Sequence, residues 1–417
     1  MATEGRHVDA TSAAATVESA NFVRIVTRAD GDALAASGVL ASALSEDGRP
    51  FQITVGRTVA DRTARAETGG DDEVTILLGP STADAIHLGA PEPGSGDDRP
   101  ITLEACDLVR ELGATPDPVL ALAGAAAAGV EPGANESEPL LERAREADLV
   151  ERRPGVAVPT ADPIDGLAHT TRCLAPWSGD LEATREALSP LVAESVDDGE
   201  SDGTVLDDDG SDEAVLDEKV PDGDALGEDD HRRLGSLVAL DVVGAEDAQP
   251  TAATAVATLL RPYETPTRRL ETIRGFADVL TATARGEPGT GVALAMGHDV
   301  ADEALDRWRD HGREAHEALD GASTGRYDGL FVVGIDSGPV ETVAEIAVRY
   351  RSPEPVVLAI GDGEAALATV DGSIDGVDSI ATKLDGATYD VGSRRAYLRY
   401  GSTVDDRTVI EEVRAGR

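Results

Sequence analysis

The stretch "NFVRIVTRADGDALAASGVLASAL", Asn21–Leu44, decides the fold class of this chain of 417 residues. Apolar residues crowd its first part, which is typical of a buried strand, and the Ala-rich second part places Leu40 and Leu44 one helical turn apart. Asp30 and Asp32 lie where the strand becomes the helix. Carboxylates at such a junction either cap the helix start or hold a metal ion, and the residues alone leave both interpretations open.

Short apolar runs and helical stretches alternate along much of the chain. "FQITVG" and "EVTILLG" are typical of strands, whereas "LEACDLVRELG" and "PLLERAREADLV" are typical of helices. Such alternation over short connections predicts an α/β fold with a doubly wound, mainly parallel sheet. The C-terminal part alternates again, from the strand "YDGLFVVGID" to the helix "TVIEEVRAG", and predicts a second, smaller α/β domain.

The pattern divides the chain into successive segments. They are an N-terminal tail (1–20), a first α/β domain (21–193), an acidic insertion (194–230), a helical connector (231–320) and the second α/β domain (321–417). The insertion is so rich in Asp, Gly and Ser that it cannot bury enough apolar surface to offset the entropy lost on ordering. We therefore expect it to be a mobile linker.

The charge balance of the chain indicates a salty cellular environment and does not indicate a function. The chain holds 80 acidic and 36 basic residues, for a net charge of -44, and its only lysines are Lys219 and Lys383. Such a composition is typical of proteins from a cytoplasm of molar salt, as in halophilic archaea. At that salt the Debye length falls to about 3 Å, so the negative charge no longer excludes a nucleic-acid partner.

Targeting signals are not apparent. No apolar run approaches the roughly 20 residues that cross a bilayer, and the polar N-terminus lacks the apolar region of a signal peptide. Cys106 and Cys173 have neither zinc-site spacing nor the pattern of a disulfide framework, and we expect both to be small buried residues. The sequence predicts a soluble, cytoplasmic protein with no membrane partner.

Three segments resemble the DHH phosphoesterases, in particular the RecJ-like branch that includes archaeal GINS-associated nucleases. "IVTRADGDALAASGVLASAL" (25–44) resembles the family's first motif, His-x-Asp-x-Asp-Gly after a strand. "RGFADVLTATARGEPGTGVALAMG" (274–297) resembles an Asn-Ala-x-x-Arg segment followed by a Gly-rich strand. "LFVVGID" and the helix and strand after it (330–364) resemble the core of the DHH-associated domain. The resemblance implies a DHH domain followed by a DHH-associated domain.

The resemblance also implies a metal site, of which little is present. In the family two manganese ions, held by several carboxylates and imidazoles, clamp the oxygens of a phosphodiester. Asp30 and Asp32 match two of these ligands, which makes them the candidates for weakly bound Mn²⁺ or Mg²⁺. Arg28 stands where the family has its histidine, and a permanent cation repels a metal.

Other positions of the family's site have changed as well. The Asp-His-His triplet does not occur in this sequence, and the nearest histidine is His87, which we expect in a surface loop. Ala128 stands at the family's last metal aspartate, with Glu131 as a weak substitute. In the segment before the second domain Thr281 replaces the family's Asn, whereas Arg285 is retained as a candidate phosphate contact.

The strand "SRRAYLRY" carries further candidates for nucleic-acid binding. Arg395, Tyr397 and Arg399 fall on one face of a strand, with Arg394 beside them. Arginine and tyrosine together can hold a phosphate backbone and stack on a base. An exposed Arg-rich strand in a protein that avoids lysine is the equal alternative.

Three other residues are expected to be structural. Trp177 in "LAPWSGD" is predicted to be an anchor in the core or at an interface. His311 and His316 lie five residues apart on a predicted helix, a spacing that does not suit a helical zinc site, and we expect them at the surface.

Two functions compete on the sequence. The preferred one is a RecJ-like replication or repair factor with a degenerate site, acting as a scaffold that binds GINS, the MCM helicase or single-stranded DNA. The alternative is an active manganese-dependent exonuclease or phosphodiesterase specific for single strands. The missing Asp-His-His triplet favours the scaffold.

Overall fold

The computed structural model describes residues 10–70, 72–89, 99–195 and 227–416. Residues 196–226, which make up most of the predicted acidic insertion, lie outside the described residues. Part of the predicted N-terminal tail is helical, because Ala13, Ala14 and Val17 of α1 (Ala10–Ser19) are buried in the first core.

The first sheet is parallel throughout. Its strands are β1 (Phe22–Arg28), β2 (Phe51–Gly56), β3 (Glu73–Leu78) and β4 (Ile86–Leu88), in the order β2-β1-β3-β4. The two faces of its central strands pack against different helices. Ile25 lies in the core that includes α2 (Gly31–Glu46), whereas Val26 packs on the opposite side with Leu77 and Ala66 of α3 (Val59–Ala66).

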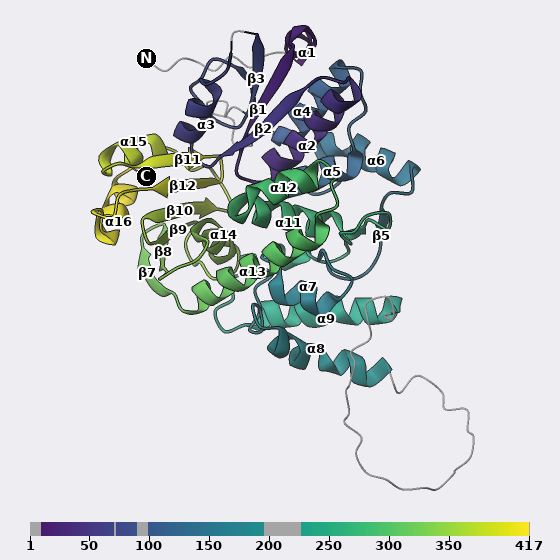
Figure 1. Cartoon of the computed structure of the whole chain (residues 1–417). Helices are drawn as coiled ribbons and strands as arrows, with labels where there is room; N and C mark the ends of the chain where they lie inside the picture. The colour runs from purple at the N-terminus through teal and green to yellow at the C-terminus, as the bar shows by residue number, and fades with distance from the viewer. Residues whose placement is uncertain (1–9, 71, 90–98, 196–226, 417) are drawn as a thin grey trace, which may run out of the picture.

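Helix α2 is buried on almost every side and forms the centre of the first core (Figure 1). It packs against α4 (Ile101–Glu111), α5 (Pro118–Ala127), α11 (Ile273–Gly286) and α12 (Pro288–Ala295). Small residues permit this close packing. A Cβ added to Gly38 would lie 2.3 Å from the carbonyl oxygen of Ala295.

A mostly helical region joins the two sheets. Its elements are η1 (Asn135–Ser137), α6 (Glu138–Glu146), β5 (Glu151–Arg152), α7 (Pro163–His169), α8 (Leu181–Ser195), α9 (Glu228–Gly244), α10 (Thr251–Ala257), β6 (Tyr263–Glu264), α11 (Ile273–Gly286), α12 (Pro288–Ala295) and α13 (Ala301–Asp320). The prediction of a Gly-rich strand after Arg285 is wrong, since helix α12 occupies this position. Pro288 starts that helix, and Gly291 packs closely on Leu34 of α2.

The second sheet is mixed. Its strands are β7 (Ser323–Tyr327), β8 (Leu330–Gly334), β9 (Val356–Gly361), β10 (Glu364–Thr369), β11 (Thr388–Val391) and β12 (Arg395–Arg399), in the order β11-β12-β10-β9-β8-β7. Only β8 and β9 pair in parallel among these described strands. Helix α14 (Val340–Tyr350) packs on one face, and α15 (Val377–Lys383) and α16 (Asp406–Ala415) contribute to the core on the other.

The two sheets meet where α3 packs against β11 (Figure 1). The carboxyl end of β1 therefore faces the second domain. The predicted α/β fold, with a parallel first sheet and a second, smaller α/β domain, is confirmed. In the described part of the chain, no helix has both the length and the apolar character that crossing a bilayer requires.

Candidate functional site

Asp30 occupies the turn that leads from β1 into α2. Its backbone is extended, with φ of -145° and ψ of 164°, and its Oδ1 accepts a hydrogen bond from the Ala33 amide at 2.8 Å. That geometry is a helix N-cap, in which the carboxylate satisfies an amide at the positive end of the helix. The capping interpretation is therefore confirmed for Asp30.

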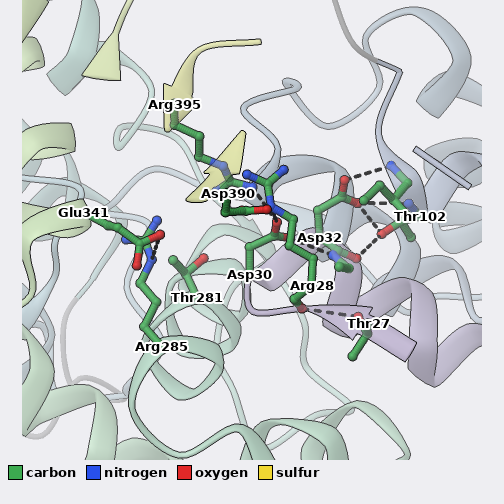
Figure 2. A network of polar contacts seen from close by, with 12 residues as sticks. Thr27, Arg28, Asp30, Asp32, Thr102, Thr281, Arg285, Glu341, Asp390 and Arg395 are labelled. Carbon is green, nitrogen blue, oxygen red and sulfur yellow. Dashed lines mark hydrogen bonds and ion pairs between the residues drawn. The ribbon is translucent and has the colours of Figure 1, made fainter. Parts of the chain in front are cut away.

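Arginines from two domains surround the carboxylate of Asp30 (Figure 2). Nε of Arg28 lies 3.1 Å from Oδ2 of Asp30 and 2.6 Å from Oδ2 of Asp390, which is on β11. Arg395 of β12 contacts the same Oδ2 of Asp30 at 2.6 Å, and Arg62 of α3 contacts Oδ1 of Asp390 at 2.5 Å. We call these five residues the charge cluster.

The charge cluster is nearly closed to solvent and carries more positive than negative groups. The side chain of Asp30 is 4% exposed and that of Arg62 is fully buried. Burial raises the pKa of Asp30, but the guanidinium groups of Arg395 and Arg28 outweigh that effect and bring the pKa below its usual value. The Asp30 carboxylate is therefore anionic and is neutralised by arginine.

Asp32 points away from the charge cluster and caps a different helix. Its Oδ2 accepts from the Ile101 amide at 2.8 Å, and its Oδ1 accepts from the Thr102 amide at 2.9 Å and from the Thr102 hydroxyl at 2.5 Å. These amides begin α4. Burial and the neighbouring charge of Asp30 raise the pKa of Asp32 to about 7.

Arg285 belongs to an adjacent group of ion pairs. Its Nη1 donates to the Thr342 hydroxyl at 2.7 Å, and its Nη2 donates to Glu345. Burial raises the pKa of Glu345, but Arg285, Arg349 and Arg395 lower it to about 2 overall. Thus Arg285 and Arg395 are both engaged with carboxylates of the protein itself.

The strand "SRRAYLRY" presents its candidates in different surroundings. Arg394 and Arg399 are exposed. Tyr397 is buried, donates to Oε1 of Glu364 at 2.6 Å and lies under the guanidinium of Arg57, which is 4.2 Å from the ring centre. The structure brings Arg395 to Asp30 but holds Tyr397 inside the second domain.

The other positions compared with the family also have structural partners. The prediction that His87 lies in a surface loop is wrong, because His87 belongs to strand β4. Its Nε2 is 2.9 Å from the carbonyl oxygen of Ala83. Glu131 pairs with Arg274, and Ala128 is the C-cap residue that follows α5. Thr281 lies against the start of α2, where a Cβ on Gly31 would approach its hydroxyl to 2.7 Å.

The expectation that His311 and His316 lie at the surface is wrong. Both rings are buried, because this face of α13 packs against the loop after α7 and against α14. Nε2 of His311 lies 2.8 Å from the Thr342 hydroxyl, and burial lowers the pKa of His311 to about 3. Trp177 is a core anchor as predicted, and its Nε1 donates to Asp241.

These residues do not fit a metal site of the family's kind. A two-metal centre needs several carboxylates or imidazoles that converge on the ions. Across the described ranges no three such side chains gather where they could hold a metal ion. The oxygens that Asp30 and Asp390 could offer accept from Arg28, Arg62 and Arg395 instead, and the guanidinium groups would repel a cation.

Sequence reasoning missed Asp390 and Arg62, which complete the charge cluster. No motif marks either residue. The one available signal is that Arg28 replaces an imidazole next to two carboxylates, because a buried guanidinium needs anionic partners from elsewhere in the fold.

Comparisons with known proteins find similarity both in sequence and in fold. A family model described as "Uncharacterized protein rrnAC1427, C-terminal domain" matches residues 322–415. The rrnAC1427 protein of Haloarcula marismortui is 43% identical over 362 residues, which cover 86% of this chain and 84% of that protein. CDC45 from Entamoeba histolytica matches over 97% of this chain and 96% of its own, with a TM-score of 0.58 and 8% identity. The exonuclease RecJ bound to manganese matches over 98% of this chain and 94% of its own, with a TM-score of 0.46 and 14% identity.

The parallel first sheet, the second sheet domain and their shared boundary are those of the CDC45 fold. Within that fold class the relationship in sequence is closer to a haloarchaeal protein. The chain belongs to the family of rrnAC1427 from Haloarcula marismortui.

Proposed function

We propose that this protein is a non-catalytic RecJ-like DHH protein of DNA replication or repair. It acts as a scaffold that binds GINS and the MCM helicase, and single-stranded DNA is a further ligand. The DHH fold that it shares with CDC45 supports a role of this kind. The observation that carries the proposal is the position of Arg28 between Asp30 and Asp390.

That position matters because a guanidinium is a permanent cation and repels a divalent metal from the carboxylates beside it. Arg28 is a fixed cation on the first domain, and it holds Asp390 of the second domain. It supplies the positive charge that a carboxylate site otherwise obtains from a metal. Arg28, and not a metal ion, thus stabilises the contact between the two domains. This suits a scaffold, which binds its partners through its surface and needs no catalytic cleft.

Single-stranded DNA would be contacted by Arg399, the exposed arginine of β12. Arg399 is the proposed phosphate contact, since Arg285 and Arg395 already hold carboxylates. At molar salt such contacts add little affinity, so binding should weaken steeply as KCl increases.

The nuclease test uses oligonucleotides labelled at either end, with manganese in molar KCl. The expected result is no digestion above the level of a metal-free control, because no pair of metals is held to activate water and neutralise the transition state. An active RecJ-type nuclease assayed in parallel confirms that the conditions support catalysis. Manganese-dependent digestion by the wild type would overturn the proposal and favour the exonuclease alternative.

The scaffold test uses purified GINS and MCM from the same source. Each is mixed with this protein in molar KCl and analysed by size-exclusion chromatography with light scattering. A complex of defined stoichiometry is expected with at least one of them. The absence of any complex at micromolar concentrations would contradict the scaffold.

A further inference from the structure

Two arginines share one tyrosine hydroxyl in the helical region between the sheets. Nη2 of Arg145 lies 3.0 Å from the hydroxyl oxygen of Tyr263, and Nη1 of Arg152 lies 3.3 Å from the same oxygen. Both guanidinium groups also stand over the Tyr263 ring, at 5.4 and 5.2 Å from its centre. Two permanent cations are thus held side by side, and we call these three residues the Tyr263 site.

Local structure brings the Tyr263 site together. Arg145 lies in the last turn of α6, and the β5–β6 ladder pairs Arg152 with Tyr263. Residues that pair directly across a ladder present their side chains on the same face. Tyr263 is 7% exposed and belongs to the first core, whereas both arginines are exposed. A buried side chain therefore fixes the position of two exposed charges.

The acidic residues of the same ladder are committed to another arginine. Nη2 of Arg153 lies 2.8 Å from Glu151, and its Nε lies 3.5 Å from Glu264. Since side chains alternate along a strand, these three residues occupy the face opposite the Tyr263 site. Among the residues that the structure describes, no carboxylate forms an ion pair with either arginine of the Tyr263 site.

Composition does not explain the missing carboxylate, because acidic residues outnumber basic ones by 80 to 36 in this chain. The ring and hydroxyl of Tyr263 attract both cations without supplying an anion. The carboxyl end of α6, beside Arg145, contributes only about half a negative charge. The Tyr263 site therefore keeps an excess of about one and a half positive charges.

We propose that the Tyr263 site binds a phosphate monoester, the singly esterified phosphate that a small molecule such as a nucleotide carries. Each guanidinium has five N–H donors and directs one of them to Tyr263, so both can donate to the oxygens of one phosphate. A monoester carries about 1.5 to 2 negative charges at neutral pH and matches the excess. The phosphodiester of a nucleic-acid backbone carries one charge and leaves part of the excess unneutralised.

The Tyr263 site is separate from the contact proposed for single-stranded DNA. Helix α6 and strand β5 lie across the molecule from β12, which carries Arg399 (Figure 1). The proposal goes beyond the scaffold function and does not depend on it. Its test uses neither DNA nor a replication protein.

The test measures saturation-transfer NMR on the methyl protons of methyl phosphate and of methyl sulfate, each added to the full chain in molar KCl. The two probes have nearly the same shape, but methyl sulfate carries a single negative charge. We expect methyl phosphate to bind at millimolar concentrations and methyl sulfate to bind at least about tenfold more weakly. Adenosine 5′-monophosphate should bind at least as tightly as methyl phosphate.

Two variants change the Tyr263 site. Arg152→Gln removes one charge-assisted donor and should weaken the binding of methyl phosphate about ten- to hundredfold. Tyr263→Phe keeps both charges and the ring but removes the hydroxyl that positions the arginines, and should weaken binding about two- to tenfold. Far-UV circular dichroism confirms that each variant is folded.

Arg143→Gln is the matched control. Arg143 lies on α6 two residues before Arg145, is also exposed, and has no ion pair within the described ranges. It lines a different cavity, beside Leu103 of α4. The control removes the same net charge as Arg152→Gln and should bind methyl phosphate like the wild type.

Three outcomes would overturn the proposal. The first is a wild type that shows no transfer to methyl phosphate at millimolar concentrations. The second is equal binding of methyl sulfate and methyl phosphate, which would contradict the match to a doubly charged group. The third is an equal loss in Arg152→Gln and Arg143→Gln, which would show that binding follows net charge and not the Tyr263 site.

Discussion

Nε of Arg28 lies 2.6 Å from Oδ2 of Asp390, although the two residues are 362 positions apart in the chain. Arg28 ends β1 of the first sheet, and Asp390 lies on β11 of the second. Both side chains are more than nine-tenths buried. A buried ion pair stabilises a protein only where geometry and further hydrogen bonds offset the loss of hydration, and here Arg62 and Asp30 supply them.

Replacing Arg28 by alanine should be strongly destabilising. The change leaves Asp390 with only Arg62 and leaves Asp30 with only Arg395 as close cations. Removing one partner of a buried pair typically costs about 3–5 kcal/mol. The measurement is the free energy of unfolding by urea in molar KCl.

Arg153→Ala is the control for Arg28→Ala. Arg153 pairs with Glu151 where both side chains are more than half exposed, and such pairs contribute at most about 1 kcal/mol. Equal losses of stability in the two variants would show that the charge cluster does not hold the domains together.

Local rules predicted the first part of the site. The stretch from β1 into α2 has a strand pattern, a helix pattern and an N-cap aspartate, and all of these depend on neighbours in sequence. Asp30 therefore caps the start of α2, as the sequence predicts. The role of Asp32 was not predictable in the same way, because the amides it caps belong to a helix that begins 69 residues later.

Strand β10 shows why parts of the second sheet were missed. Its sequence, "EAALAT", is rich in alanine, which favours helices and is depleted in strands. It is a strand because it pairs with β9 on one side and β12 on the other. Pairing with strands that are distant in the sequence overrides the helix propensity of alanine there. Distant packing also explains the burial of His311, which lies against Thr342 of α14.

Asp32→Asn should destabilise the protein even though the side chain keeps its shape. Both carboxylate oxygens accept from the start of α4, and asparagine has only one oxygen to offer. Its NH₂ group would then face a buried N–H, at a cost of about 1–3 kcal/mol. Thermal unfolding of the variant measures this loss.

Asp162→Asn is the matched change at another helix start. Asp162 caps α7 through one oxygen, which accepts from the Ile164 amide. Asparagine is as good an N-cap as aspartate at such a site, so the change should be close to neutral. Similar losses for both variants would contradict the two-oxygen cap assigned to Asp32.

Gly38→Ala should disrupt the crossing of α2 and α12. The added Cβ would meet the Ala295 carbonyl oxygen at 2.3 Å, and a backbone atom cannot turn aside as a side chain can. Such overpacking costs about 1–3 kcal/mol or more. Gly289→Ala, in α12 with no atom within 4 Å of the new Cβ, should instead stabilise by about 0.5–1 kcal/mol. Chemical denaturation distinguishes the two, and a stabilising Gly38→Ala would mean that the helices are not in close contact.

The stability of the protein should fall in acid as Glu345 is protonated. The pKa of Glu345 is about 2 in the folded protein, below its ordinary value of 4.5, because Arg285, Arg349 and Arg395 outweigh the effect of burial. A lowered pKa means that the stabilisation is complete above pH 4.5 and is lost as the pH falls toward 2. The size of the shift corresponds to about 3 kcal/mol.

Glu345→Gln tests this assignment through its pH dependence. At neutral pH the variant should be less stable than the wild type by up to about 3 kcal/mol, and the difference should shrink as the pH is lowered below 4.5. Glu182→Gln is the control. It removes a pair with Arg185 in which the Glu182 side chain is 82% exposed, and it should lower the stability by less than about 1 kcal/mol at neutral pH. Urea unfolding at a series of pH values gives both curves. A constant difference between wild type and Glu345→Gln from pH 7 to pH 3 would show that Glu345 is not held as an anion by the three arginines, and that the contact between α11 and α14 depends on packing alone.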